Sequence, residues 1–169
     1  MRLSDNRFDK FNLHHMIIKP LYLGVLLNIV LPGAFLFVCY YMNNNNSYTN
    51  ALVDFNTANI LFYVFAVLAL VNSGLALFMR QKLYSTQLVK SKENFEEELT
   101  LVLLEKIRPI FILISVISIY GVGYYFLTTR FKEAALFVVF SFIVFQVVRP
   151  RIGFIQKLID AQMKLLNKE

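Results

Sequence analysis

Four long apolar stretches, separated by polar segments, dominate the pattern of the chain. They cover residues 20–42, 58–79, 109–127 and 131–148. A helix that crosses the hydrocarbon core of a bilayer needs about 20 apolar residues. Within the membrane, helices are the reasonable spanning structure for such runs because they satisfy their own backbone polar groups. The pattern therefore predicts an all-α integral membrane protein, with residues 1–169 forming a single membrane domain of four transmembrane helices.

Parts of this pattern occur twice. The second span and its polar end match the fourth span and its tail at one constant offset, with Leu61, Phe62, Val64, Phe65, Gln81, Lys82, Leu83 and Gln87 corresponding to Leu136, Phe137, Val139, Phe140, Gln156, Lys157, Leu158 and Gln162. A basic residue followed by proline also precedes the first and third spans. Internal duplication is a common way to build membrane folds. We therefore expect two tandemly repeated, adjacent hairpins, with repeat unit one at about residues 8–90 and repeat unit two at about residues 95–169.

Amphipathic patterns follow both expected hairpins. After residue 150, apolar residues recur at helical spacing, with Lys157, Lys164 and Lys168 on the other face. A similar pattern fills the connector before the third span. The sequence thus predicts cytoplasmic amphipathic helices, and the apolar face of the tail helix suits either lipid or a protein partner.

The basic residues indicate the orientation. All but two of the 17 Lys and Arg residues lie in the N-terminal segment, in the central segment 80–108 or in the tail, and the exceptions are Arg130 and Lys132. The positive-inside rule then places both termini in the cytoplasm, as in a multi-pass protein of the bacterial inner membrane. Topology and anionic headgroups account for the isoelectric point near 9.5, which argues against a nucleic-acid partner.

Composition agrees with this class. Apolar residues make up 57% of the chain, charged residues 17%, and the mean hydropathy is +0.56. Soluble domains have more charge and fewer apolar residues.

Polar and small residues within the spans are candidates for helix packing. Asn28 and Asn72 reach similar depths if the first two spans are antiparallel. We expect their amides to bond each other, and the alternative is that they bind an ion or substrate. Ser73 stands in a small-residue stripe with Ala69 and Ala76, which suits close approach of another helix.

Three further residues are interface candidates. Gly121 marks a packing face of the third span. Glu105 and Arg108 stand three residues apart at the membrane boundary, and we expect them to form an interfacial ion pair.

Residues that carry chemistry are sparse. The cores of the four spans contain no Asp, Glu, Lys, Arg or His, although ion and proton pathways in membranes usually need them. No nucleophile triad, metal cluster or phosphate-binding loop can be assembled. The sequence therefore predicts no catalytic residues, no metal and no cofactor, and it favours neither an enzyme nor a transporter acting as a lone subunit.

The second half of the second span resembles a known family. Small residues, then Asn72, then an apolar turn closed by Arg80 and Lys82 are similar to the second span of the ATP synthase protein I family. The similarity continues through Glu105, the short outer turn 132–135 and the end of the fourth span at 146–150, and it covers roughly residues 58–150. The chain departs from that family in its Asn-rich loop, its long central segment and its extended tail.

The resemblance implies a role beside the rotary ATP synthase. Members of that family help to assemble its membrane ring and, by some accounts, supply magnesium. Asn72, Arg80 and Glu105 are the positions that carry over. We therefore expect a non-enzymatic accessory or assembly subunit of a larger membrane complex. Its partners would be the lipid bilayer and either other subunits or further copies of itself. The alternative is a small oligomeric channel or carrier whose pore forms between copies.

The orientation can be tested by thiol labelling. In a chain whose native Cys39 has been replaced, a cysteine at Ser47 should react with an impermeant reagent added outside intact cells, and one at Ser91 should react only after lysis. Labelling of Ser91 but not Ser47 in intact cells would reverse the orientation.

Overall fold

The computed structural model describes residues 11–45, 51–89 and 94–167. These residues form helices and connections, without strands. The helices, in chain order, are α1 (Leu13–Val25), η1 (Leu26–Val30), α2 (Leu31–Asn44), α3 (Phe55–Lys82), α4 (Phe95–Thr128), α5 (Phe131–Val148) and α6 (Ile152–Leu166). η1 is a single π-helical turn that joins α1 and α2 into one continuous rod.

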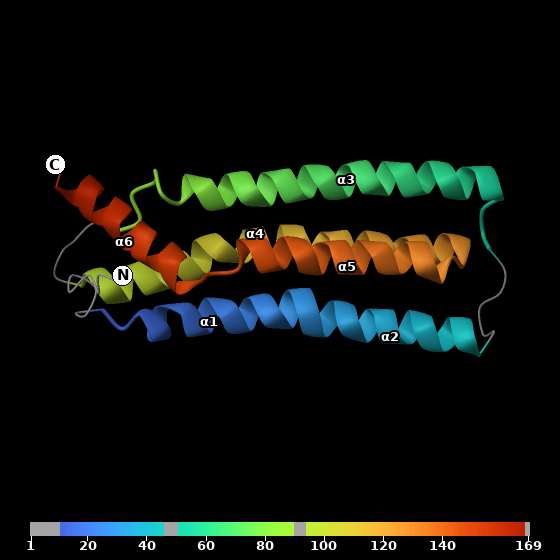
Figure 1. Ribbon diagram of the computed structural model, residues 1–169, viewed down its shortest axis with the longest axis horizontal. Coiled ribbons are helices and arrows are strands. Elements are labelled where there is room, and N and C mark those ends of the chain that lie inside the picture. The colour runs from blue at the N-terminus through green and yellow to red at the C-terminus, as the bar shows by residue number, and fades with distance from the viewer. Residues whose placement is uncertain (1–10, 46–50, 90–93, 168–169) are drawn as a thin grey trace, which may run out of the picture.

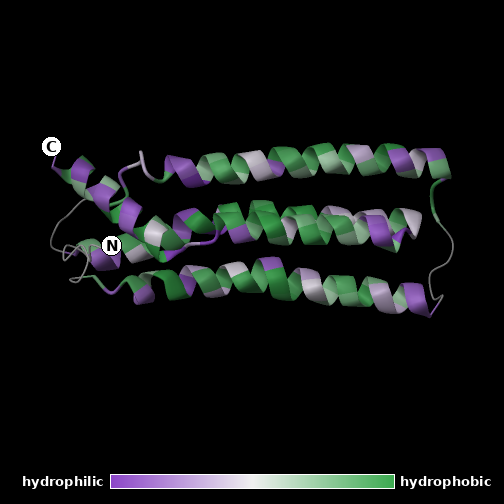
Figure 2. Cartoon of the chain, viewed as in Figure 1, coloured by the Kyte–Doolittle hydropathy of each residue, from purple (hydrophilic) through white to green (hydrophobic). Residues whose placement is uncertain are grey.

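Within the described residues, four helical segments are long and apolar enough to cross a membrane. They are Leu13–Asn44, which combines α1, η1 and α2, and the helices α3, α4 and α5. Figure 2 shows apolar residues along most of their length and more polar residues toward their ends. The prediction of an all-α fold with four helices long and apolar enough to cross a membrane is confirmed. Which end faces the cytoplasm stays a prediction, and Ser47 and Ser91 lie outside the described residues.

Local sequence signals set the helix ends. The Asp54 carboxylate caps α3 by accepting hydrogen bonds from Thr57, and these bonds hold the pKa of Asp54 below its ordinary value. α4 ends where Thr129 adopts a left-handed conformation with φ of 60°. α5 ends at Val148, because Pro150 disfavours a helical conformation for the residue before it, and Arg149 is extended. This break lets α6 leave the bundle at an angle (Figure 1).

α4 is longer than the predicted third span. The apolar run begins at Pro109, but the helix runs unbroken for 34 residues from Phe95 and contains this proline. Pro109 lacks the N–H group that would bond the carbonyl of Glu105. Glu105 is exposed just before the start of the apolar run, where water can satisfy that carbonyl. The predicted connector helix and third span are therefore one continuous element.

The spans do not pack as two adjacent hairpins. α4 and α5 contact each other extensively, and α3 packs mainly on α4. The rod of α1, η1 and α2 packs on α4 and α5 from the other flank, so the second helix pair separates the two helices of the first (Figure 1). This order differs from the expected hairpin arrangement. Whether the matching sequences reflect a duplication stays a prediction.

The lengths of the connections explain this order. Only Thr129 and Arg130 join α4 to α5, so these helices must be antiparallel neighbours. Residues 45–54 join α2 to α3, which is enough chain to cross the end of α4. There the backbone N–H of Leu52 donates to the carbonyl of Leu127 at 2.9 Å.

A compact apolar core lies at the end of the bundle that carries both ends of the described chain (Figure 1). It is built from α6, the first half of α4, the start of α1 and the turn after α3. Its buried members include Met16, Leu83, Leu88, Val89, Phe95, Leu99, Leu103, Phe154, Ile155, Leu158 and Ile159. The apolar face of α6 is thus covered by the chain itself, although the sequence pattern suggested lipid or a partner. We call this region the end cap.

Two glycines allow the closest helix contacts. A Cβ atom on Gly121 would lie 2.6 Å from the backbone oxygen of Ala134. Gly121 is on α4 and Ala134 is on α5, so the two helices approach closely at this point. A Cβ atom on Gly24 would lie 2.6 Å from the Phe145 ring and 2.9 Å from the Phe111 ring. These contacts hold α5 and α1 close to α4. Gly123 has nothing within 4 Å of that position.

Gly121 and Gly123 form a matched pair for mutation. Gly121→Ala should destabilise the purified protein by about 1–3 kcal/mol, because the methyl group meets backbone and the helices must move apart. Gly123→Ala should be neutral or slightly stabilising, since alanine favours the helix. Reversible unfolding in mixed detergent micelles measures both. Equal stabilities of the two variants would contradict the close contact at Gly121.

Candidate interface site

Asn28 lies inside the bundle, in the π-helical turn. Its side chain is 1% exposed, and its amide donates to the Gly24 carbonyl of its own helix at 3.2 Å. The amide oxygen Oδ1 has no partner among the described residues. Pro32 cannot donate to the Asn28 carbonyl, and the π-turn immediately before it is the local adjustment that a proline in a membrane helix requires. Asn28 therefore bonds within its helix.

Asn72 bonds a different partner from the one predicted. Its amide donates to the hydroxyl of Tyr120 on α4 at 3.1 Å. The Tyr120 ring stacks on Phe65 of α3, with ring centroids 5.5 Å apart and planes at 15°. The expected bond to Asn28 does not form, because α4 and α5 stand between α3 and the first span. Asn72 is thus a link between α3 and α4.

Ser73 lies on the buried face of α3. Its hydroxyl donates to the carbonyl of Ala69 in its own helix at 2.7 Å. Ala69 and Ala76 are also buried, and α4 is the main neighbour of α3. Because the Ser73 hydroxyl is hydrogen-bonded within α3, it needs no partner from α4.

A second polar link was missed by sequence reasoning. The buried hydroxyl of Ser118 on α4 donates to that of Ser141 on α5 at 2.8 Å. Neither serine is among the packing and interface candidates named from the sequence. The signal available was an isolated serine in the middle of an otherwise apolar span.

The expected ion pair at the membrane boundary is not formed. Glu105 and Arg108 are both exposed on α4, and the described part of the chain holds no salt bridge between them. A spacing of three residues brings two side chains near each other on a helix. Exposed ion pairs nevertheless contribute little to stability, and water easily replaces them.

Arg130 links α5 to α3 at the other end of the bundle. Its guanidinium donates to the Asn59 side chain at 2.7 Å and lies 4.3 Å from the centroid of the Phe55 ring. Sequence analysis used Arg130 only to assign topology. A single basic residue at the end of a span does not reveal a cross-helix bond.

Gln162 anchors the end cap and was not singled out as a site. It is 0% exposed. Its side chain accepts from the N–H of Leu88 at 2.7 Å and donates to the carbonyl of Thr86 at 2.9 Å. These bonds satisfy the backbone of the turn after α3. Gln87, its match in the repeated sequence, is exposed in that turn, so the two matching glutamines have different local roles.

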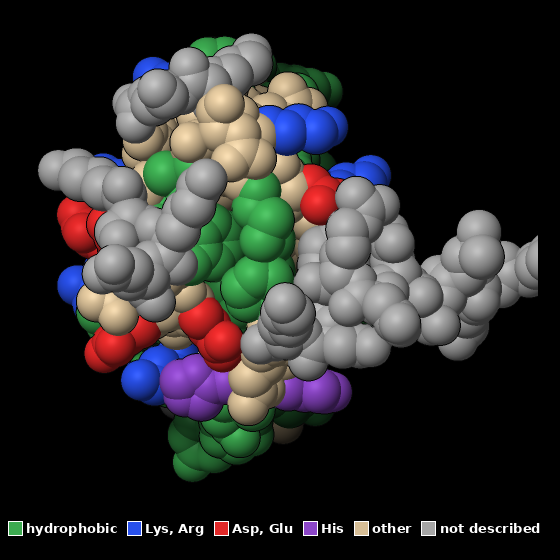
Figure 3. Space-filling view, turned by 90° about the vertical axis from the view of Figure 1, so that its left-hand side faces the viewer, with side chains coloured by type: hydrophobic (Ala, Val, Ile, Leu, Met, Phe, Trp, Pro, Cys, Tyr) green, Lys and Arg blue, Asp and Glu red, His purple; other side chains and the backbone are tan. Residues whose placement is uncertain are grey.

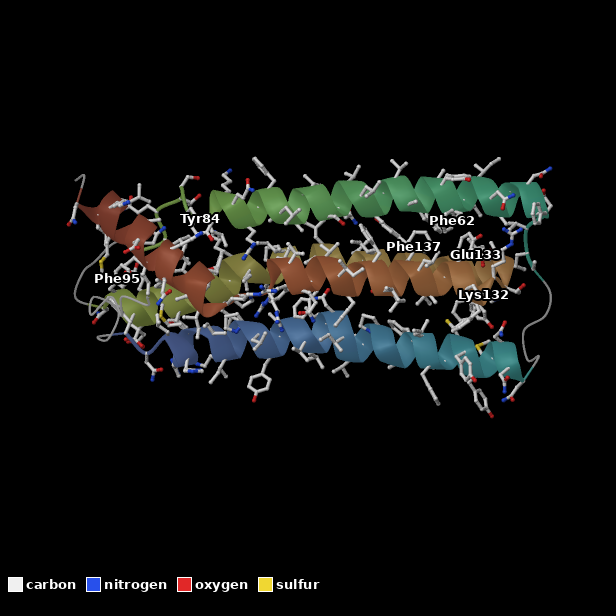
Figure 4. All side chains as sticks on the ribbon, in the orientation of Figure 1. Phe62, Tyr84, Phe95, Lys132, Glu133 and Phe137 are labelled. Atoms are coloured by element: carbon white, nitrogen blue, oxygen red, sulfur yellow. The ribbon has the colours of Figure 1, made fainter. Side chains whose placement is uncertain are left out.

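An apolar groove opens between α3 and α5, which contact each other less than either contacts α4. Its volume is about 220 Å³, and it is lined by Phe62, Ala66, Ala69, Leu70, Leu136, Phe137 and Phe140. Figure 4 shows Phe62 and Phe137 between the two helices, and their ring centroids are 5.5 Å apart. The small residues on α3 leave space where larger ones would fill the gap.

Acidic and histidine side chains lie at the end of the bundle that carries the end cap. Figure 3 shows apolar side chains at the middle of this end, with acidic, basic and histidine side chains around them. Across the described ranges, no three His, Cys, Asp or Glu side chains come close enough to hold an ion.

Comparisons with protein-family models, with curated proteins and with solved structures find no significant match to this chain. Its function therefore has to be argued from the groove, the buried links and the charged groups of the chain itself.

The link between Asn72 and Tyr120 can be measured by a double-mutant cycle. Asn72→Leu and Tyr120→Phe should each lower the free energy of unfolding by about 0.6–2 kcal/mol. The double variant should lose less than the sum, because the second change removes the unpaired group that the first one left.

Asn28→Leu is the matched control for this cycle. It should combine additively with Asn72→Leu, because the two side chains do not touch. Additive losses for Asn72 and Tyr120 would contradict the hydrogen bond between α3 and α4.

Proposed function

We propose that this chain is a non-enzymatic accessory or assembly subunit that binds a transmembrane helix of a larger membrane complex. The observation that carries this proposal is the apolar groove between α3 and α5. Polar side chains inside the spans mostly bond within the chain, as Asn72 and Ser118 do. Such pairing supports a structural role for these polar side chains. The groove is then the feature of the spans that a second molecule would bind.

The shape of the groove suits a helix. Ala66 and Ala69 stand three residues apart on α3 and allow close backbone approach, which is how helices associate when both are already in lipid. Phe62, Phe137 and Phe140 provide aromatic walls. A partner side chain that fills this space gains packing contacts that disordered lipid chains provide less well.

The rotary ATP synthase is the candidate complex. This choice rests on the resemblance carried by Asn72, Arg80 and Glu105. We also propose the finer expectations drawn from the sequence. They are a location in the bacterial inner membrane, cytoplasmic termini, an origin by duplication and amphipathic helices on the cytoplasmic side.

Co-purification in mild detergent tests the proposal. The tagged chain should bring subunits of the ATP synthase, identified by mass spectrometry. Ala66→Phe, which fills the groove, should reduce their recovery several-fold. Ala34→Phe is the matched control, because Ala34 is exposed on α2, on the other flank of the bundle, and it should leave recovery unchanged.

Other outcomes would redirect the proposal. Recovery of the chain only as copies of itself would favour the alternative, an oligomeric channel or carrier with its pore between copies. If Ala66→Phe does not change the recovery of synthase subunits, the partner binds the chain at a place other than the groove.

A further inference from the structure

Three arginines lie where α3, α5 and α6 meet, and the described residues supply no carboxylate to any of them. Arg80 is in the last turn of α3, and Arg149 and Arg151 lie between α5 and α6. The Nε atoms of Arg80 and Arg149 are buried without hydrogen-bond partners in the described chain. A half-buried guanidinium is costly to leave unpaired, so this group of like charges needs an explanation.

The position of Arg80 is set by packing. Its guanidinium lies 4.8 Å from the centroid of the Phe154 ring in α6. The same ring packs against Tyr84, with centroids 5.5 Å apart. Burial raises the pKa of the Tyr84 hydroxyl, while the Arg80 charge opposes this shift. Phe154 thus holds a cation and a neutral phenol at the end of α3.

Arg151 brings a second charge close to Arg80. Phe154, whose ring contacts Arg80, donates its backbone N–H to the Arg151 carbonyl at 2.9 Å, so both arginines lie at the first turn of α6, where their like charges repel. Arg151 is also the N-cap residue of α6 and provides no side-chain cap to that helix. One of its Nη atoms donates to the Gln146 carbonyl at 2.9 Å, which fixes the side chain beside the end of α5.

The first turn of α6 adds positive potential at the same place. The N–H groups of Ile152 and Gly153 have no acceptor in the described chain, and N–H groups at a helix start favour anions. Nothing lies within 4 Å of the place where a Cβ of Gly153 would stand. A ligand can therefore approach this turn.

We propose that Arg80, Arg151 and the first turn of α6 bind a phosphate group. Guanidinium groups match phosphate oxygens in geometry and charge, and a bound phosphate would relieve the repulsion between the two arginines. The site lies at the ends of the α3 and α5 spans, the level at which the headgroups of anionic phospholipids are found.

Binding of defined probes to the purified protein tests this site. Dioctanoyl phosphatidylglycerol should raise the thermal unfolding midpoint in detergent and remain bound in native mass spectrometry. Phosphatidylcholine of the same chain length should do so far less, because its headgroup carries no net charge. Inorganic phosphate is the third probe. An effect of the lipid alone identifies a headgroup site, and an equal effect of inorganic phosphate identifies a site for free phosphate.

Variants locate the binding. Arg80→Gln and Arg151→Gln should each weaken phosphatidylglycerol binding by about tenfold or more, the loss expected for a charge-assisted hydrogen bond. Lys82→Gln is the matched control, because Lys82 is exposed two residues after Arg80, and it should bind normally. Arg80→Lys keeps the charge and should weaken binding less than Arg80→Gln, which separates binding from misfolding. The proposal is overturned if neither phosphatidylglycerol nor inorganic phosphate affects the wild-type protein, or if Lys82→Gln weakens binding as much as Arg80→Gln.

Discussion

The close contact of α4 with α5 is the constraint on which the rest of the bundle depends. Inside a bilayer, an apolar side chain gains little by leaving lipid for another helix, so packing relies on close backbone approach and polar bonds. Gly121 permits that approach, and the two-residue connection through Thr129 and Arg130 enforces it. With α5 held in place, α4 has one flank left for α3 and another for the first span. The order of the four helices follows from this pair.

Polar bonds then fix the relative rotation of the helices. Ser118 and Ser141 join α4 to α5, Asn72 and Tyr120 join α3 to α4, and Arg130 joins α5 to α3 at the far end. The first two bonds satisfy groups that would be costly to leave alone in hydrocarbon. The first span fits closely through Gly24, which lies against the rings of Phe111 and Phe145. At its start, the backbone N–H of Asn12 donates to the Glu96 carboxylate of α4 at 3.2 Å.

The length of the apolar runs was enough to predict the four spans, because the bilayer thickness sets a minimum that few other structures share. Their order in space was not predictable in the same way. All four spans are apolar on every side, so the pattern does not indicate which face of a helix meets which neighbour. Asn72 stood out as a polar residue, but its partner was predicted wrongly, because Tyr120 looks like any other aromatic residue in a membrane helix. In the sequence, Gln162 was noted only as the residue that matches Gln87. Its role could not be predicted, because it depends on a turn that lies far away in the sequence.

The bonds of Gln162 also bear on the order of events during synthesis. The turn that they satisfy follows α3, but Gln162 emerges from the ribosome only after α4 and α5 have been made. Until then, the N–H of Leu88 and the carbonyl of Thr86 must remain bound to water, and the apolar residues around them stay uncovered. The end cap can therefore close only after all four spans have been translated.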